Sequence, residues 1–271
     1  MNQRISDMRH FFVIEKGQKA YWQEGVDPYL LAEKFETQKT DPVDRATERL
    51  LWMLEHEQPV IFPGEKIAFT RTVTQIPEIF TEAEMDEIRK DHYIHEKGDV
   101  FNINADFGKL LNTGLAPKKA ELAAKQEELQ AAGEIEKAHY VACQIAILDG
   151  ILDLAERYRL KAVEEGNTVV AKALANVPAN RPQSLLEALQ MMRILHYVMW
   201  CARSYHNTVG RFDQYIYPWF AADMEKGLYT EEEVLEIDPN SLGGKNSVTL
   251  NGKFNKTPIT DINEARKILK G

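Results

Sequence analysis

Residues 184–220, SLLEALQMMRILHYVMWCARSYHNTVGRFDQYIYPWF, form the longest apolar stretch of the chain and hold its densest group of aromatic residues. Ser184 followed three residues later by Glu187 predicts a helix start, because each side chain can accept a hydrogen bond from a free backbone N–H group. From Leu185 to Ala202 only four residues are strongly polar. We therefore expect a helix that is buried on most of its surface.

The stretch changes character after this helix. His206–Asn207 and Gly210 predict a break, and residues 211–217 place charges beside aromatic rings. Pro218 is predicted to end or restart a helix, because proline lacks the backbone donor that a helix interior needs. A buried helix that leads into a polar, aromatic turn is typical of the wall of a binding site. It is equally typical of the end of an ordinary core, and spacing alone does not separate the two.

The composition of the whole chain excludes some classes of function. Its 271 residues are enough to bury a large core. The 33 Lys and Arg residues against 42 Asp and Glu residues give a net charge of −9, and no basic run is present. This balance argues against general binding to nucleic acid. The first residues have no apolar core of signal-peptide length, and no uncharged apolar run is long enough to cross a membrane. We expect a cytoplasmic protein without a membrane partner.

The cysteines and histidines give no recognisable metal pattern. Cys143 and Cys201 each stand in an apolar helical segment, so we expect buried free thiols rather than a disulfide or a metal site. His92 and His95 could share one helix face, as metal ligands sometimes do. We favour a solvated polar segment there, since no third ligand follows at a recognisable spacing. No metal site is expected.

Upstream of the apolar stretch, the chain is predicted to be mainly helical. Asp41 as a cap with Pro42 at the first helical position predicts a helix through His56. Residues 58–76 carry prolines, a glycine and short apolar runs, which predicts a strand or an extended segment. Thr81 and Glu84 form a second capping pattern, for a helix through Arg89.

A long helical pair is predicted over residues 117–132 and 134–165, with Gly133 between the two helices. The first helix is rich in strong helix formers, and the second has an apolar repeat close to 3.6 residues. We expect Arg157, in the second helix, to hold a carboxylate on a neighbouring helix. Thr230 and Glu233 predict one more short helix, Val234 to Ile237.

The amino-acid sequence of residues 187–217 resembles that of the glycyl radical enzymes, the pyruvate formate-lyase-like family. The resemblance rests on EALQ at 187–190, on a histidine before the break and on GRFDQYIYP at 210–218. The resemblance is continuous from about residue 58 to Ile237 and is weaker at its start, where Ala68 and Phe69 replace the small residues more usual in the family. The resemblance implies a mainly α chain with a few short strands (α+β), the N-terminal helical part of a truncated α/β barrel.

Four residues are candidates for lining a substrate pocket. The family has a histidine near substrate upstream of an acidic–aromatic pair, which here is Asp106–Phe107, and Asn102 stands at that histidine position. Asparagine cannot act as an acid or a base near neutral pH, which puts a proton-transfer role there in doubt. The other candidates lie in the break and the following turn: His206, Arg211 and Asp213. We expect a nearby carboxylate to hold Arg211.

No catalytic residue is assigned. The resemblance implies a radical-storing glycine and a thiyl cysteine on loops C-terminal to the matching stretch, and no Gly-Cys pair or arginine–glycine–tyrosine loop occurs in the 271 residues. Cys143 and Cys201 stand within helices, where a thiyl radical could not meet a polar substrate. We divide the chain into a pyruvate formate-lyase-like helical domain, 1–237, and a divergent tail, 238–271, with a hairpin and a short helix.

Three functions remain open at this point. The chain is a partial glycyl radical enzyme that is inactive alone, or a degenerate relative that acts as a binding or regulatory module, or an unrelated helical enzyme with an acid–base pair such as Asp213 and His206. The literal match makes the third the weakest. No bound cofactor is expected; complete members receive a glycyl radical from a radical S-adenosylmethionine activase. The expected partners are that activase and either a second copy or a complementary chain covering the apolar helix.

Overall fold

The structure is a computed structural model, and it describes residues 3–11, 26–70, 73, 75–90, 103–204, 207–230, 233–234 and 237. The predicted tail, 238–271, and the pair His92 and His95 lie outside the described residues. The division of the chain at residue 237 therefore stays a prediction.

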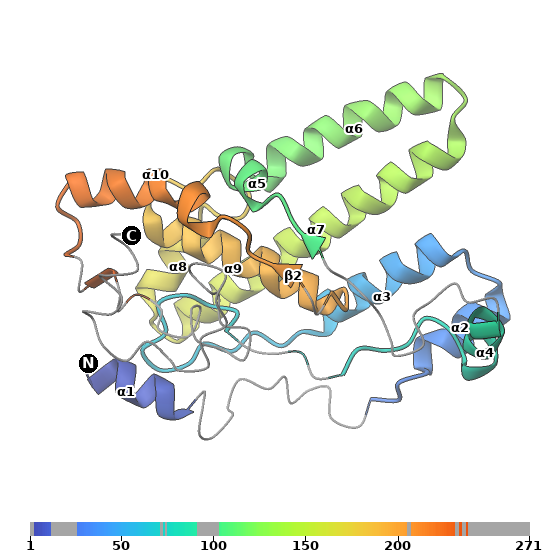
Figure 1. Ribbon diagram of the computed structural model, residues 1–271, viewed down its shortest axis with the longest axis horizontal. Helices are drawn as coiled ribbons and strands as arrows, with labels where there is room; N and C mark the ends of the chain where they lie inside the picture. The colour runs from blue at the N-terminus through green and yellow to red at the C-terminus, as the bar shows by residue number, and fades with distance from the viewer. Residues whose placement is uncertain are drawn as a thin grey trace.

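The described part of the chain is mainly helical (Figure 1). In chain order its elements are α1 (Gln3–Arg9), α2 (Leu30–Gln38), α3 (Pro42–His56), α4 (Glu82–Lys90), β1 (Ile103–Asn104), α5 (Phe107–Thr113), α6 (Leu115–Ala131), α7 (Ile135–Glu164), α8 (Thr168–Leu174), α9 (Leu185–Cys201), β2 (Asn207–Thr208) and α10 (Phe212–Glu225). The mainly helical class is thus confirmed for these residues.

Helix α3 begins as predicted. The Asp41 carboxylate accepts a hydrogen bond from the backbone N–H of Val43 at 2.9 Å, and Pro42 occupies the first turn. Its apolar face carries Leu50 and Met53 into the main core. The Thr81–Glu84 capping box that precedes α4 is also confirmed.

Helices α6 and α7 run side by side as a hairpin whose turn is formed at Gly133 (Figure 1). Helix α7 is the one described helix that is long and apolar enough to cross a membrane by length and composition alone. It packs against α3, α6 and α8, and it buries Leu154 and Tyr158 completely. Helix α7 is thus buried along one stripe, as in a helix packed on a core, and length and composition alone are weak evidence for a membrane span.

Helix α9 forms the centre of the main core, as its apolar sequence predicts. Ten of its residues are buried, and it contacts α3, α5, α8 and α10. The Ser184 hydroxyl accepts from the N–H of Glu187 at 3.2 Å, and the Glu187 carboxylate accepts from the N–H of Gln183 at 2.8 Å. The reciprocal cap is confirmed, with the glutamate reaching one residue further back than in the usual box.

The extended segment before α4 is held by a side chain of α9. The Gln190 amide accepts from the N–H of Ala68 at 2.8 Å and faces its carbonyl at 3.4 Å. Gln190 is 0% exposed. Residues 58–70, 73, 75 and 76 contain no strand, and this glutamine supplies the backbone partners that a neighbouring strand would supply.

Phe69, the next residue along, has an unusual backbone conformation. Its φ is +70°, in the left-handed region that a bulky side chain rarely adopts. Its ring is completely buried and stacks on Tyr158 with 3.8 Å between the ring centres, and the tilted Tyr197 ring has its centre 5.5 Å away. The left-handed φ gives a physical reason why a small residue would suit this position.

Helix α10 corrects the prediction made from Pro218. The helix runs without interruption from Phe212 to Glu225 with Pro218 inside it. Pro218 is exposed, as is Gln214, whose carbonyl would otherwise receive the missing bond. Trp219, directly after the proline, anchors the helix by donating from its indole nitrogen to the carbonyl of Pro182 at 2.8 Å. Tertiary contacts thus outweigh the cost of the proline.

A buried carboxylate joins α10 to the start of α9. Asp223 is 1% exposed, and its carboxylate accepts from the backbone N–H of Leu185 at 2.7 Å. A negative charge at this position satisfies a free donor of the first turn and interacts favourably with the positive end of the helix dipole. The C-terminal part of α10 is therefore bonded to the N-terminus of α9.

Candidate functional site

The two short strands pair in parallel. Ile103 of β1 lies opposite Asn207 of β2, and Asn104 lies opposite Thr208. The chain between them passes through α5 to α9, so the pair is a parallel sheet unit with a helical crossover. Candidate pocket residues Asn102 and His206 lie outside the described residues, each one position before a paired residue in the sequence.

The turn after β2 is packed directly on β1. Gly210 has a φ of +60°, and a Cβ atom there would lie 2.5 Å from the Asn104 amide oxygen. The positive φ favours glycine, and any side chain at this position would also force the Asn104 amide to move. The Tyr215 hydroxyl donates to the carbonyl of Val209 at 2.8 Å, and the Tyr215 ring lies 6.1 Å from that of Phe107. The sequence GRFDQY thereby fixes the turn against both β1 and α5.

The turn presents Arg211 and Asp213 as a bidentate ion pair. The guanidinium donates to the two carboxylate oxygens at 3.0 and 2.8 Å, as predicted for a carboxylate partner. The hydrogen bond from Arg211 lowers the pKa of the Asp213 carboxyl, and the same bond raises the pKa of Arg211. Both groups stay charged near neutral pH. They can orient a polar ligand, and neither is suited to exchange a proton there.

Two of the four predicted pocket residues are therefore located, and they lie together. Arg211 and Asp213 are exposed, with side-chain exposures of 67% and 49%. Contact with solvent leaves both free to meet a further segment of protein or a ligand. The acid–base pairing of Asp213 with His206 stays a hypothesis, because His206 lies outside the described residues.

The two cysteines are buried free thiols, as predicted. Burial raises the pKa of the Cys201 thiol far above its ordinary value, and Cys201 is 0% exposed inside α9. Burial also raises the pKa of Cys143, and the nearby Asp44 carboxylate raises it further. The thiolate is the nucleophilic form, so neither cysteine is activated for nucleophilic attack.

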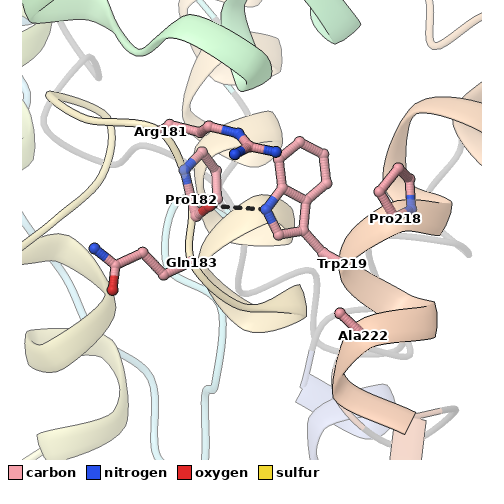
Figure 2. Close-up of a pocket in the computed structure, with 6 residues that line it drawn as sticks. All are labelled: Arg181, Pro182, Gln183, Pro218, Trp219 and Ala222. Atoms are coloured by element: carbon pink, nitrogen blue, oxygen red, sulfur yellow. Dashed lines mark hydrogen bonds between the residues drawn. The ribbon is translucent and has the colours of Figure 1, made fainter. Parts of the chain in front are cut away.

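A pocket that the sequence did not predict lies between the linker before α9 and the exposed side of α10 (Figure 2). Its volume is about 420 Å³, and its lining includes Arg181, Gln183 and Trp219. The Arg181 guanidinium lies over the Trp219 ring at 5.6 Å from the ring centre, a cation–π contact. The lining has no carboxylate, histidine or thiol, so the pocket offers binding and no acid–base chemistry.

A half-buried histidine of α9, His196, is expected to make stability depend on pH. Burial, with a contribution from Arg193, lowers the pKa of His196 to about 3, and Arg193 Nη1 lies 3.1 Å from His196 Nδ1. The unfolded chain takes up a proton near pH 6.5 and the folded chain does not, so stability is full above pH 6.5 and falls as the pH drops toward 3.

We expect this group to remove about 2 kcal/mol of the free energy of unfolding between pH 7 and pH 5. Urea titrations at the two pH values measure the loss. His196→Gln should reduce it by about that amount, whereas His56→Gln, which changes an exposed histidine of α3, should leave it unchanged. Equal pH dependence in His196→Gln and the wild type would contradict the assignment.

Comparison with known proteins identifies the family. Residues 71–238 match the family model described as "Pyruvate formate lyase-like". The glycyl radical subunit of 4-hydroxyphenylacetate decarboxylase from Clostridioides difficile is 32% identical over 118 residues, 39% of this chain. Isethionate sulfite-lyase from Bilophila wadsworthia is 29% identical over 147 residues, 48% of this chain. These stretches span only 13% and 18% of the two relatives.

Solved structures agree on the fold. The B12-independent glycerol dehydratase from Clostridium butyricum aligns with a TM-score of 0.66 at 16% identity, over 89% of this chain and 39% of that one. A glycyl radical enzyme from Archaeoglobus fulgidus aligns with a TM-score of 0.63 at 19% identity, over 79% of this chain and 37% of that one. The family match covers more than half of the 271 residues. The chain is therefore a member of the pyruvate formate lyase-like family, with glycyl radical enzymes as its relatives.

Proposed function

We propose that this chain is the N-terminal helical portion of a glycyl radical enzyme, which builds one wall of the barrel and supplies no radical residue of its own. The observation that carries the proposal is the parallel pair of β1 and β2 behind a helical crossover, in a chain that aligns with little more than a third of its structural neighbours. A parallel pair of this kind is what one edge of an α/β barrel requires.

The radical chemistry is proposed to come from residues that these 271 do not include. No Gly-Cys pair and no arginine–glycine–tyrosine loop is present in the sequence. Cys143 and Cys201 are buried within helices and have raised thiol pKa values. A hydrogen-abstracting thiyl must touch its substrate, so a cysteine packed in a helical core does not suit that role.

The Arg211–Asp213 pair, with Asn102 and His206, is proposed to border the substrate pocket of the assembled enzyme. Its bidentate geometry and contact with solvent support a role in orienting a polar substrate or a neighbouring loop. Tyr217, in the next turn of α10, is 60% exposed and offers an aromatic surface to the same neighbour. Which bond such an enzyme would cleave depends on the residues that complete the pocket.

The proposed partners are a complementary chain or segment that carries the cysteine and glycine loops, and the radical S-adenosylmethionine activase that installs the glycyl radical. Association with a second copy of this chain is the alternative. We propose that the protein acts in the cytoplasm, without nucleic acid and without a membrane.

Electron paramagnetic resonance tests the proposal. After anaerobic treatment with a radical S-adenosylmethionine activase, we expect no organic-radical doublet from this chain alone. The glycyl radical subunit of 4-hydroxyphenylacetate decarboxylase, treated in parallel, is the positive control. A doublet from the isolated chain would overturn the proposal.

Sedimentation distinguishes the competing role as a binding or regulatory module. We expect this chain to associate with a polypeptide that carries the missing barrel loops of a family member. A stable monomer that does not bind that polypeptide would favour the stand-alone module instead.

A further inference from the structure

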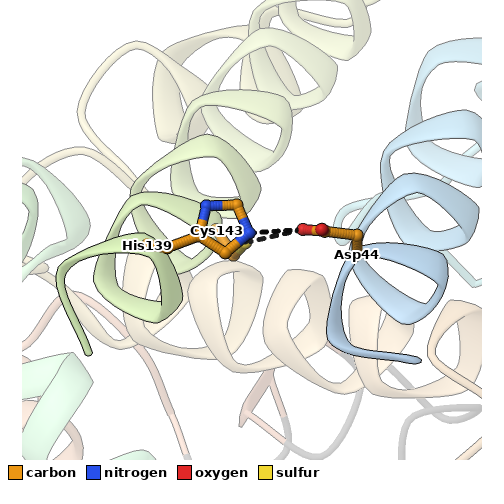
Figure 3. A group of neighbouring side chains, drawn as sticks. All are labelled: Asp44, His139 and Cys143. Atoms are coloured by element: carbon orange, nitrogen blue, oxygen red, sulfur yellow. Dashed lines mark hydrogen bonds and ion pairs between the residues drawn. The ribbon is translucent and has the colours of Figure 1, made fainter. Parts of the chain in front are cut away.

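Three side chains with metal-ligating atoms meet between α3 and α7, away from the Arg211–Asp213 turn (Figure 3). Asp44 comes from the first turn of α3, and His139 and Cys143 stand four residues apart on one face of α7. The carboxylate oxygen, the imidazole Nε2 and the thiol sulfur all lie within 4.8 Å of one another. The two helices pack against each other, and this packing places the three side chains together.

The distances match a tetrahedral ion closely on two of three edges. Cys143 Sγ lies 3.6 Å from the Asp44 oxygen and 3.8 Å from His139 Nε2. Zinc bonds of about 2.3 Å to sulfur and about 2.0 Å to nitrogen or oxygen place such atoms about 3.6 Å apart. The third edge, from His139 to Asp44, is 2.6 Å and would widen to about 3.3 Å around an ion. Both of these side chains are partly exposed and have room to move.

The geometry fits ligand chemistry better than catalysis by the thiol. The Nε2 nitrogen of His139 lies near both Asp44 and Cys143, so the carboxylate does not orient the ring from its other nitrogen. A nucleophilic triad needs the base and the orienting carboxylate on opposite nitrogens. A thiolate and a carboxylate together carry two negative charges, which a divalent ion neutralises.

We propose that Asp44, His139 and Cys143 bind one zinc ion, with water in the fourth position. The donor set of thiolate, imidazole and carboxylate is one that zinc uses in proteins. The ion links the start of α3 to the first half of α7 and displaces the thiol proton when it binds. Access is open, since the His139 side chain is 57% exposed and the Asp44 side chain 32%.

The sequence contains only part of this signal. His139 and Cys143 at a spacing of four share a helix face, whereas Asp44 is 95 positions from His139. The expectation of no metal site came from the apolar helical setting of Cys143 and from the lack of a third ligand for His92 and His95. The approach of Asp44 to His139 and Cys143 comes from the packing of α3 on α7 and gives no signal in the sequence.

Metal titration tests the proposal. The complete chain, stripped with a chelator and kept reduced, is titrated with Zn²⁺ by calorimetry and with Co²⁺ by absorption. We expect saturation at one ion per chain, a cobalt–thiolate charge-transfer band, and a higher melting temperature with Zn²⁺. Cys143→Ser should abolish the band even though Cys201 remains. Asp44→Asn and His139→Gln should each weaken binding by at least about tenfold, a factor that even outer-shell changes reach.

The control variant is His56→Gln, which removes an exposed histidine from the far end of α3 and should bind zinc as the wild type does. Circular dichroism verifies that each variant is folded, and Asp44→Asn changes the fewest packing contacts. The proposal is overturned if the wild type takes up no ion, if the band persists in Cys143→Ser, or if the folded Asp44→Asn and His139→Gln variants bind zinc with unchanged affinity.

Discussion

Replacing Arg45 with methionine is expected to lower the free energy of unfolding by about 3–5 kcal/mol. Arg45 is 6% exposed, and its guanidinium donates to the carbonyls of Thr40 at 2.8 Å and Ile79 at 3.0 Å and to the Glu84 carboxylate at 2.9 Å. It also lies 5.1 Å from the centre of the Phe80 ring. Methionine fills similar volume, yet it removes the hydrogen bonds that the guanidinium donates to the two carbonyls and to the Glu84 carboxylate.

Urea unfolding at neutral pH measures this effect. The matched control is Arg89→Met, which removes an arginine from an exposed ion pair with Asp86 and should cost at most about 1 kcal/mol. Arg45 holds the loop before α4 onto α3, so its variant should also lose protection from proteolysis near Ile79. A loss no larger than that of Arg89→Met would contradict the assignment of Arg45 as an anchor.

Replacing Gln190 with leucine is expected to cost about 2–4 kcal/mol, because the change removes the partner of two buried backbone groups of Ala68. The side chains have similar volumes, so the loss reports hydrogen bonding rather than a cavity. Gln190 belongs to the EALQ segment by which the chain resembles its family. Its role is to fasten the extended segment to α9, and the expected effect is on stability rather than on a reaction.

Gln214→Leu is the matched control for this prediction, because Gln214 belongs to the other recognisable segment, GRFDQYIYP, and is exposed. It should change the free energy of unfolding by less than about 0.5 kcal/mol, as surface substitutions usually do. Both variants are measured by urea unfolding. If Gln190→Leu is no less stable than Gln214→Leu, the two hydrogen bonds between Gln190 and Ala68 contribute nothing to stability.

Helix starts could be predicted from the sequence because a cap is a local pattern. Asp41, Ser184 and Thr230 each lie within three residues of the group that they bond, so their spacing carries the whole signal. The Arg211–Asp213 pair was predictable for the same reason, since the two residues are two positions apart. The burial of α9 followed from its composition.

Contacts between distant segments could not be predicted in this way. Arg157 was expected to hold a carboxylate on another helix; it bonds Asp153 in its own helix and donates to the carbonyls of Glu57 and Leu54. Free carbonyls at the end of α3 give no sequence signal, because every residue has one. The prediction that Pro218 ends or restarts a helix was wrong, because the effect of a proline depends on the contacts that anchor α10 on either side of it.

The burial of Phe69 has a consequence for which substitutions the chain can accept. Glycine there would relax a left-handed backbone that costs a non-glycine residue on the order of 1 kcal/mol. It would also delete a buried ring that stacks on Tyr158, a loss of about 3–5 kcal/mol. The loss of the buried ring therefore outweighs the relief of backbone strain at this position. A relative with a small residue at this position needs a larger side chain nearby to fill the space. We therefore expect the side-chain volumes at this position and at a neighbouring one to change in opposite directions between relatives.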